Sequence, residues 1–185
     1  MGNYFQTVVD LDATESDVEA VAAAGLEWLV EEGIVAAELT DCVLGAPLGH
    51  PPGPRWREAV VEDGWEPSDG LKVITGRTVF DGGQGEPWFA VCPHCAGRVD
   101  LSTGEVWEPF REAVDTWNDT GRAAVACPKC GRTGDLTAWA WSDNYFAFAC
   151  LGFEFWDWPE FRPDFLEHFA LALGGHRPVL MGGKL

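Results

Sequence analysis

Two short cysteine motifs constrain the fold of this chain more than any other feature of its 185 residues. They are Cys92-Pro93-His94-Cys95 and Cys127-Pro128-Lys129-Cys130. Two residues between the cysteines let both sulfurs of a tight turn face one ion, and the proline fixes the backbone of that turn. Two such turns supply four thiolates, which form a closed tetrahedral shell. The spacing therefore predicts a metal site whose ligands are Cys92, Cys95, Cys127 and Cys130.

The chemistry of four thiolates indicates which metal the site holds. Soft sulfur ligands select zinc or iron–sulfur centres over magnesium and calcium. Zinc is the commoner occupant of a structural four-thiolate site, so we predict Zn²⁺ as a structural cofactor, with iron as the open alternative. A closed shell leaves no position for water or substrate, which favours a structural role. Gly131 and Gly97 are both expected to relax the backbone where N–H groups turn toward the sulfurs.

The segment between the two motifs is longer than in a compact zinc ribbon. It has 31 residues, against roughly 15–20 in such a ribbon. Residues 105–119 place Trp107, Phe110, Val114 and Trp117 at helical spacing, so we predict an inserted helix with one aromatic face. A redox role is the alternative, because Cys-Pro-His-Cys resembles the active site of thioredoxin-fold oxidants. That role needs a helix after the motif, whereas residues 96–104 favour a turn and a strand.

The acidic composition narrows the classes of partner. Twelve Lys and Arg against thirty Asp and Glu give a formal net charge of −18. So few basic residues disfavour binding to nucleic acid or to an anionic membrane, and no apolar run reaches the roughly 18–20 residues of a membrane span. The N-terminus has neither the basic start nor the apolar stretch of a signal peptide. We therefore expect a cytoplasmic protein, and a protein partner would be basic.

Hydrophobic periodicity predicts the α+β class. Strands are expected at 4–11, 34–44, 71–80 and, as an edge, 177–181; a hairpin is expected from 136–141 and 145–150. Helices are expected at 16–32, where Ser16 and Glu19 suggest a capping box, at 55–63, at 105–119, and after Pro163.

These elements predict an antiparallel sheet with about three helices and a zinc-ribbon-like double-knuckle element. We expect a single domain over 1–185. Its parts are an N-terminal α+β part at about 1–84, a zinc-ribbon-like part with the helical insertion at about 88–150, and a C-terminal helix and tail at about 151–185. Cys42 and Cys150 lie outside the motifs, in apolar stretches, and are expected to be buried free thiols.

Aromatic residues and carboxylates interleave near the C-terminus and form a second candidate site. Most of the ten Trp and eleven Phe are expected in the core. The candidates for a partner surface or a pocket are Glu154, Trp156, Asp157, Trp158 and His168. Carboxylates among rings can carry out acid–base chemistry, but strand alternation equally places Glu154 toward solvent. No nucleophile motif lies near these candidate residues or near His50, which is in a loop. The sequence therefore favours a non-enzymatic protein over an enzyme.

The double Cys-Pro-x-Cys pattern and the stretch 153–169 resemble a family of uncharacterised bacterial proteins, common in actinobacteria. The specific part of the resemblance covers Cys92 to Cys130. It implies a zinc-ribbon-like module in an α+β domain and no known activity, so only the four cysteines carry over. The sequence as a whole predicts a zinc-binding, non-enzymatic protein-interaction module. The alternatives are an enzyme with an aromatic and carboxylate pocket in the C-terminal half, or a CxxC redox protein.

Overall fold

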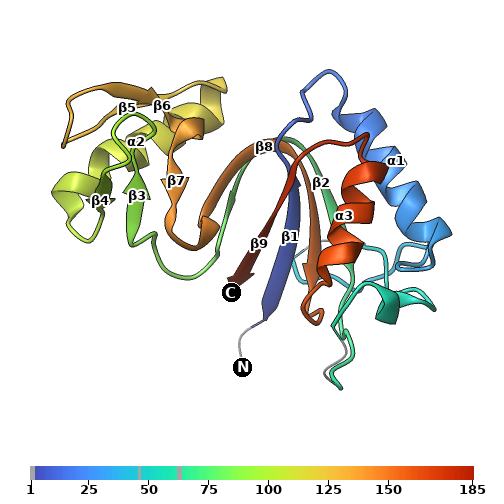
Figure 1. Ribbon diagram of the computed structural model, residues 1–185. Helices are drawn as coiled ribbons and strands as arrows, with labels where there is room; N and C mark the ends of the chain where they lie inside the picture. The colour runs from blue at the N-terminus through green and yellow to red at the C-terminus, as the bar shows by residue number, and fades with distance from the viewer. Residues whose placement is uncertain (1–2, 46, 62–63) are drawn as a thin grey trace. The chain divides into compact units, whose positions relative to one another are not determined.

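The computed structural model describes residues 3–45, 47–61 and 64–185, and the chain divides into two compact units. Unit 1 comprises Met1–Gly76 and Ala149–Leu185, so it contains both ends of the chain. Unit 2 is the intervening segment Arg77–Phe148, and both cysteine motifs lie in it (Figure 1). The three-part division of a single domain expected from the sequence stays a prediction.

Unit 1 is built on a four-stranded sheet. In chain order its elements are β1 (Tyr4–Asp10), α1 (Val18–Glu31), a 3₁₀ turn η1 (Trp56–Glu58), β2 (Leu71–Asp81), β8 (Phe146–Trp156), α3 (Pro163–Ala172) and β9 (Pro178–Lys184). The strand order is β2-β8-β1-β9, and β1 is antiparallel to both of its neighbours. One helix follows β1 and the other follows β8, which gives the split β-α-β arrangement of ferredoxin-like folds. Unit 2 is inserted in the chain between β2 and β8. The last residues of β2, 77–81, and the first residues of β8, 146–148, belong to unit 2.

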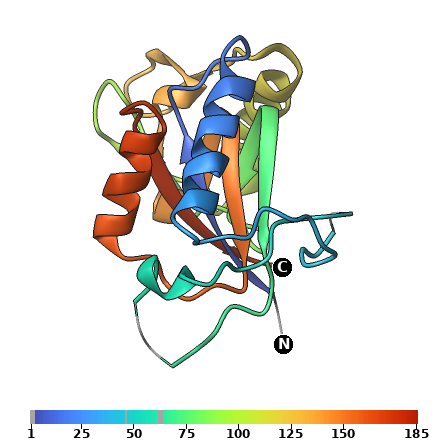
Figure 2. The ribbon, with the colours of Figure 1, turned by 90° about the vertical axis from the view of Figure 1, so that its right-hand side faces the viewer.

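The core of unit 1 lies between its sheet and its two helices. Figure 2 shows α1 and α3 side by side on one face of the sheet. Phe153 of β8, Leu29 of α1 and Phe169 of α3 are each 0% exposed. Gly25 allows α1 to approach closely, because a Cβ there would lie 2.7 Å from Phe153 Cζ and 2.8 Å from Leu173 Cδ2. The aromatic residues near the C-terminus therefore mainly fill this core.

Unit 2 consists of short strands around one helix. Its elements are β3 (Phe89–Val91), β4 (Arg98–Asp100), α2 (Gly104–Thr120), β5 (Ala124–Ala126), β6 (Thr133–Asp135), η2 (Leu136–Ala138), β7 (Ala140–Trp141) and η3 (Ser142–Asn144). The strands form one sheet of order β4-β3-β7 and a separate pair β5-β6. Helix α2 buries Phe110, Ala113 and Trp117, and the Phe110 ring packs edge-on against Trp139 and Trp141. The aromatic helix face predicted from the sequence thus fills the core of unit 2.

The α+β class, the three helices and the antiparallel sheets are as predicted. Among the described residues, no helix is both long enough and apolar enough to span a membrane. The strand predicted at 34–44 is wrong: this segment makes only isolated bridges, such as Val35 with Pro52. The predicted hairpin is also wrong, because β7 pairs with β3 and β8 pairs with β1. The helix predicted at 55–63 is a single turn over Trp56–Glu58, and residues 62–63 lie outside the described residues.

Candidate metal centre

The four motif cysteines meet at one point of unit 2. Their Sγ atoms all lie within 4.8 Å of one another. The Cys92 and Cys130 sulfurs are 3.9 Å apart, as are those of Cys95 and Cys127. Four sulfurs at about 2.3 Å from a central zinc stand about 3.8 Å apart in a regular tetrahedron. The observed spacing therefore fits a tetrahedral metal ion held by four thiolates.

The two motifs form matching turns, which we call knuckles 1 (92–97) and 2 (127–132). In knuckle 1 the Ala96 N–H donates to the Cys92 carbonyl at 3.0 Å, and in knuckle 2 Gly131 donates to Cys127 at 2.8 Å. The Cys92 N–H donates in turn to the Gly97 carbonyl, and the Cys127 N–H donates to the Arg132 carbonyl. Knuckle 1 also directs N–H groups at its sulfurs, from His94 to Cys92 and from Gly97 to Cys95, both at 3.4 Å. Such N–H donors favour the thiolate form that a metal requires.

Each knuckle packs against the other through its third residue. The ring of His94 contacts the residue that directly follows knuckle 2, with Nε2 2.9 Å from the Thr133 carbonyl oxygen. Nε2 therefore carries the proton and donates it to that oxygen. Lys129 extends the other way, and its Cδ would lie 3.0 Å from a Cβ placed on Gly97. His94 thus orients the neighbouring knuckle and takes no place among the four ligands.

The backbone of knuckle 1 differs from the sequence-based expectation at one residue. Gly131 has φ +71°, as its predicted role requires, but in knuckle 1 the left-handed residue is Ala96, with φ +53°. Left-handed backbone is unfavourable for an L side chain but open to glycine. Gly97 is instead needed for space, because a Cβ there would lie 3.0 Å from Cys95 Sγ.

This difference predicts opposite effects of two matched substitutions. Ala96→Gly should raise the free energy of unfolding by about 0.5–1 kcal/mol, and Gly131→Ala should lower it by about 1 kcal/mol. A Cβ on Gly131 would meet no atom within 4 Å, so its effect is confined to the backbone. Thermal unfolding at fixed zinc concentration measures both, as shifts of roughly 2–4 °C in opposite directions. Shifts of the same sign would contradict the assignment.

The electrostatics of the four thiols favour a cation. Burial raises the pKa of Cys92, but the N–H groups of Cys95 and His94, together with neighbouring thiols, bring it down to about 6. The Gly97 N–H lowers the pKa of Cys95, but desolvation and the three neighbouring cysteines raise it to about 11. The opposite shifts of Cys92 and Cys95 limit the repulsion between two neighbouring thiolates when no metal is bound. A metal ion bound here would replace protons, so its affinity would fall as pH falls.

The residues of the second candidate site differ in their exposure to solvent. Trp156 and Trp158 are 4% and 3% exposed, Glu154 and Asp157 are half-buried, and His168 is exposed. Glu154 accepts a hydrogen bond from the Trp156 indole at 2.8 Å. Burial, and then the charge of Asp157, raise the pKa of Asp69, a residue absent from the sequence-based candidates. The two indoles thus serve the core of unit 1, and the part of this set at the surface is carboxylate and imidazole.

The loop residue His50 and the two cysteines outside the motifs are all partly shielded from solvent. His50 is half-buried, and its Nδ1 lies 3.0 Å from the Ala36 carbonyl oxygen. Cys42 and Cys150, which were expected to be buried, are both half-buried. No helix follows Cys95: the chain turns directly into β4. The helix that lowers the thiol pKa in thioredoxin-like sites is therefore missing from these described residues.

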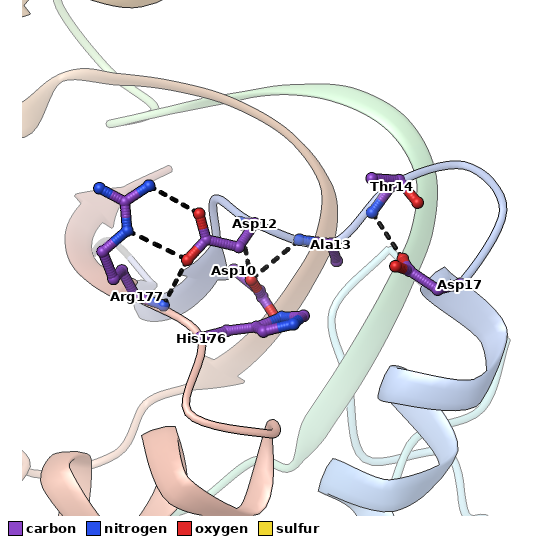
Figure 3. Close-up of polar contacts among 7 residues, drawn as sticks. All are labelled: Asp10, Asp12, Ala13, Thr14, Asp17, His176 and Arg177. Atoms are coloured by element: carbon purple, nitrogen blue, oxygen red, sulfur yellow. Dashed lines mark hydrogen bonds and ion pairs between the residues drawn. The ribbon is translucent and has the colours of Figure 1, made fainter.

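A buried carboxylate that the sequence reading missed lies at the end of β1. Asp10 is 0% exposed and accepts hydrogen bonds from the N–H groups of Asp12 and Ala13. Its other oxygen lies 2.8 Å from Nδ1 of His176 (Figure 3). Beside it, Asp12 accepts two bonds from the Arg177 guanidinium, at 2.7 and 3.1 Å. These pairs fix the entry into β9, and their distance along the chain hides them from local pattern analysis.

The Asp12–Arg177 pair predicts an effect on acid stability. The Arg177 side chain, and then its N–H, lower the pKa of Asp12 from 3.8 to about 2. The stabilisation is therefore present above about pH 4 and is lost as pH falls toward 2. Asp12→Asn should lower the free energy of unfolding at pH 7 by less than about 1 kcal/mol, because Arg177 is largely exposed. Hydrogen exchange of β1 across this pH range should show the difference from wild type disappearing; a constant difference would contradict it.

Comparison with known proteins adds no relative. No protein-family model, curated protein or solved structure matches this chain. The resemblance to a family of uncharacterised bacterial proteins therefore stays a prediction, and the geometry of the cysteine cluster carries the functional argument.

Proposed function

We propose that this protein is a zinc-binding, non-enzymatic interaction module in which a structural zinc orders unit 2. The observation that carries the proposal is the set of four sulfurs within 4.8 Å of one another, two from each knuckle. Four thiolates at this spacing match the ligand set of structural zinc and leave no open position for substrate. Cys92, Cys95, Cys127 and Cys130 would hold the ion, and the bound ion would supply a cross-link between the two knuckles.

The short strands of unit 2 explain why it would need a metal. Strands β3, β4, β5 and β6 have three residues each, and β5-β6 is a two-stranded sheet. Two-stranded sheets of this length are not stable by themselves in water. Cys92 and Cys127, which are 2% and 1% exposed, belong to the same hydrophobic cluster as Phe110 and Trp139. Zinc would therefore join the knuckles to the α2 core.

The excess of acidic residues in unit 1 favours a basic protein as the partner. Unit 1 carries twenty of the thirty acidic residues but only six of the twelve basic ones. Four of those six, Arg55, Arg57, Arg162 and Arg177, are already paired with carboxylates of unit 1. The remaining carboxylates, such as Glu19, Glu27 and Glu31 on the exposed side of α1, are therefore in large excess. Such a field speeds the approach of a basic protein and depends on salt.

Elemental analysis of the purified full chain tests the metal. We expect about one zinc per chain, with Cys42 and Cys150 as the two thiols that react readily. Iron in place of zinc would correct the identity of the metal, and a metal-free chain with disulfides inside the motifs would overturn the proposal.

For the partner, pull-downs should compare wild type with a variant carrying Glu19→Gln, Glu27→Gln and Glu31→Gln. Basic proteins bound by wild type at low salt should be lost with the variant; enrichment of acidic or neutral proteins alone would contradict a basic partner.

A further inference from the structure

The four sulfurs differ in their exposure to solvent, and the pattern of exposure is the same in both knuckles. The first cysteine of each knuckle is buried, while the second, Cys95 or Cys130, is exposed. The exposed sulfurs are therefore the ones that a solute in water can reach. Zinc-bound cysteines are thiolates, the reactive form toward oxidants.

Each exposed sulfur has a buried sulfur of the other knuckle close to it. Cys95 lies 3.9 Å from Cys127, and Cys130 lies 3.9 Å from Cys92. A disulfide requires about 2.05 Å between sulfurs, so each crossed pair must close by roughly 2 Å. Ala96, next to Cys95, has a positive φ, which is unfavourable for an L residue. This unfavourable conformation lies in knuckle 1, which must move when the disulfide forms.

We infer that this centre is a peroxide-sensitive switch in which oxidation joins the knuckles crosswise and ends zinc binding. The inference rests on the proposed zinc site. In the first step the Cys95 thiolate attacks a peroxide oxygen, the S–O bond forms, the O–O bond breaks, and hydroxide leaves. The Cys127 thiolate then attacks the Cys95 sulfur, the S–S bond forms, and the S–O bond breaks with loss of a second hydroxide. Two protons from the buffer acid convert both hydroxides to water, so two thiolates lose two electrons to one peroxide.

The second crossed pair reacts in the same way, from Cys130 to Cys92. Four thiolates and two peroxides, with four protons, thus give two disulfides and four waters, and the four sulfurs can no longer act as ligands. Because Cys92 and Cys127 belong to the core around Phe110 and Trp139, this change should also loosen unit 2. Reduction of the disulfides by a thiol restores the ligands, which makes the change reversible.

The test uses zinc-loaded full-length protein carrying Cys42→Ala and Cys150→Ala, so that only the four ligand thiols remain. Hydrogen peroxide is added, released zinc is followed with a chromogenic chelator, and disulfides are mapped by mass spectrometry after rapid alkylation. We expect about one zinc per two peroxides and the pairs Cys95–Cys127 and Cys92–Cys130 at early times. A reductant with zinc should restore the starting state.

A second variant keeps four ligands while removing one exposed sulfur. Cys95→His preserves a Cys₃His shell, and release should slow by about two-fold because one of two entry points is lost. Its early product should be Cys92–Cys130 alone. Disulfides within the motifs, or zinc retained at excess peroxide, would overturn the inference while leaving the zinc site intact. A chain that holds no zinc before peroxide is added would overturn the proposed function itself.

Discussion

Replacing Cys127 by serine should abolish zinc binding and unfold unit 2 while unit 1 stays folded. Cys127 is 1% exposed and lies among Val125, Leu136 and Trp139, so the variant loses a metal ligand inside the core. Structural zinc contributes on the order of 10 kcal/mol to small metal domains, about as much as a whole domain's stability. Hydrogen exchange resolved by segment should show rapid exchange across 89–135 and continued protection of β1, β8 and α1.

Matched controls separate loss of the metal from loss of a thiol. Cys42→Ser changes a half-buried cysteine of unit 1, so it should leave zinc content and the protection of unit 2 as in wild type. Treatment of wild-type protein with a strong chelator should reproduce the Cys127→Ser pattern, and added zinc should reverse it only in wild type. A Cys127→Ser protein that retains one zinc and full protection of 89–135 would rule out the assigned ligand set.

The cluster of four cysteines could be predicted from sequence because the geometry of each knuckle is local. Two residues between cysteines fix how each pair of sulfurs is presented, whatever surrounds the turn. The same holds for α1, α2 and α3, whose helical periodicity lies within a few turns of chain. The capping box expected at Ser16 fails: the structure begins α1 after Asp17, and the Ser16 hydroxyl pairs with Thr14.

The errors and omissions lie where the structure depends on distant residues. Period-two alternation identified 145–150 as a strand, but the strand β8 continues to Trp156, and its residues 151–156 pair with β1, near the start of the chain. The Asp10–His176 pair joins residues 166 positions apart, and nothing near either residue indicates the other. The local sequence pattern likewise could not predict that Cys95 and Cys130 are exposed, because their exposure depends on how the knuckles pack against α2. Sequence spacing thus predicted which four sulfurs come together, and tertiary packing decides which of them solvent reaches.

Phe153→Ala should lower the stability of unit 1 more than any surface change, by about 3–5 kcal/mol. The Phe153 ring is 0% exposed, packs edge-on against Phe169 at 4.9 Å, and lies where α1 comes closest at Gly25. Truncation leaves a cavity at the meeting point of β8, α1 and α3, and rigid helices cannot close it fully. Urea unfolding of zinc-loaded protein, followed by hydrogen exchange of β1 and α1, measures the loss.

The matched control is Leu171→Ala on α3, whose side chain is 71% exposed. It also truncates a large apolar side chain to alanine, but this side chain is mostly exposed, so the effect on stability should stay within about 0.5 kcal/mol. Zinc content should remain near one per chain in both variants, because Phe153 lies in unit 1 and all four ligands lie in unit 2. Loss of zinc in Phe153→Ala under conditions where unit 1 remains folded would contradict this separation. A loss of stability below about 1 kcal/mol would contradict the central place of Phe153 in the core.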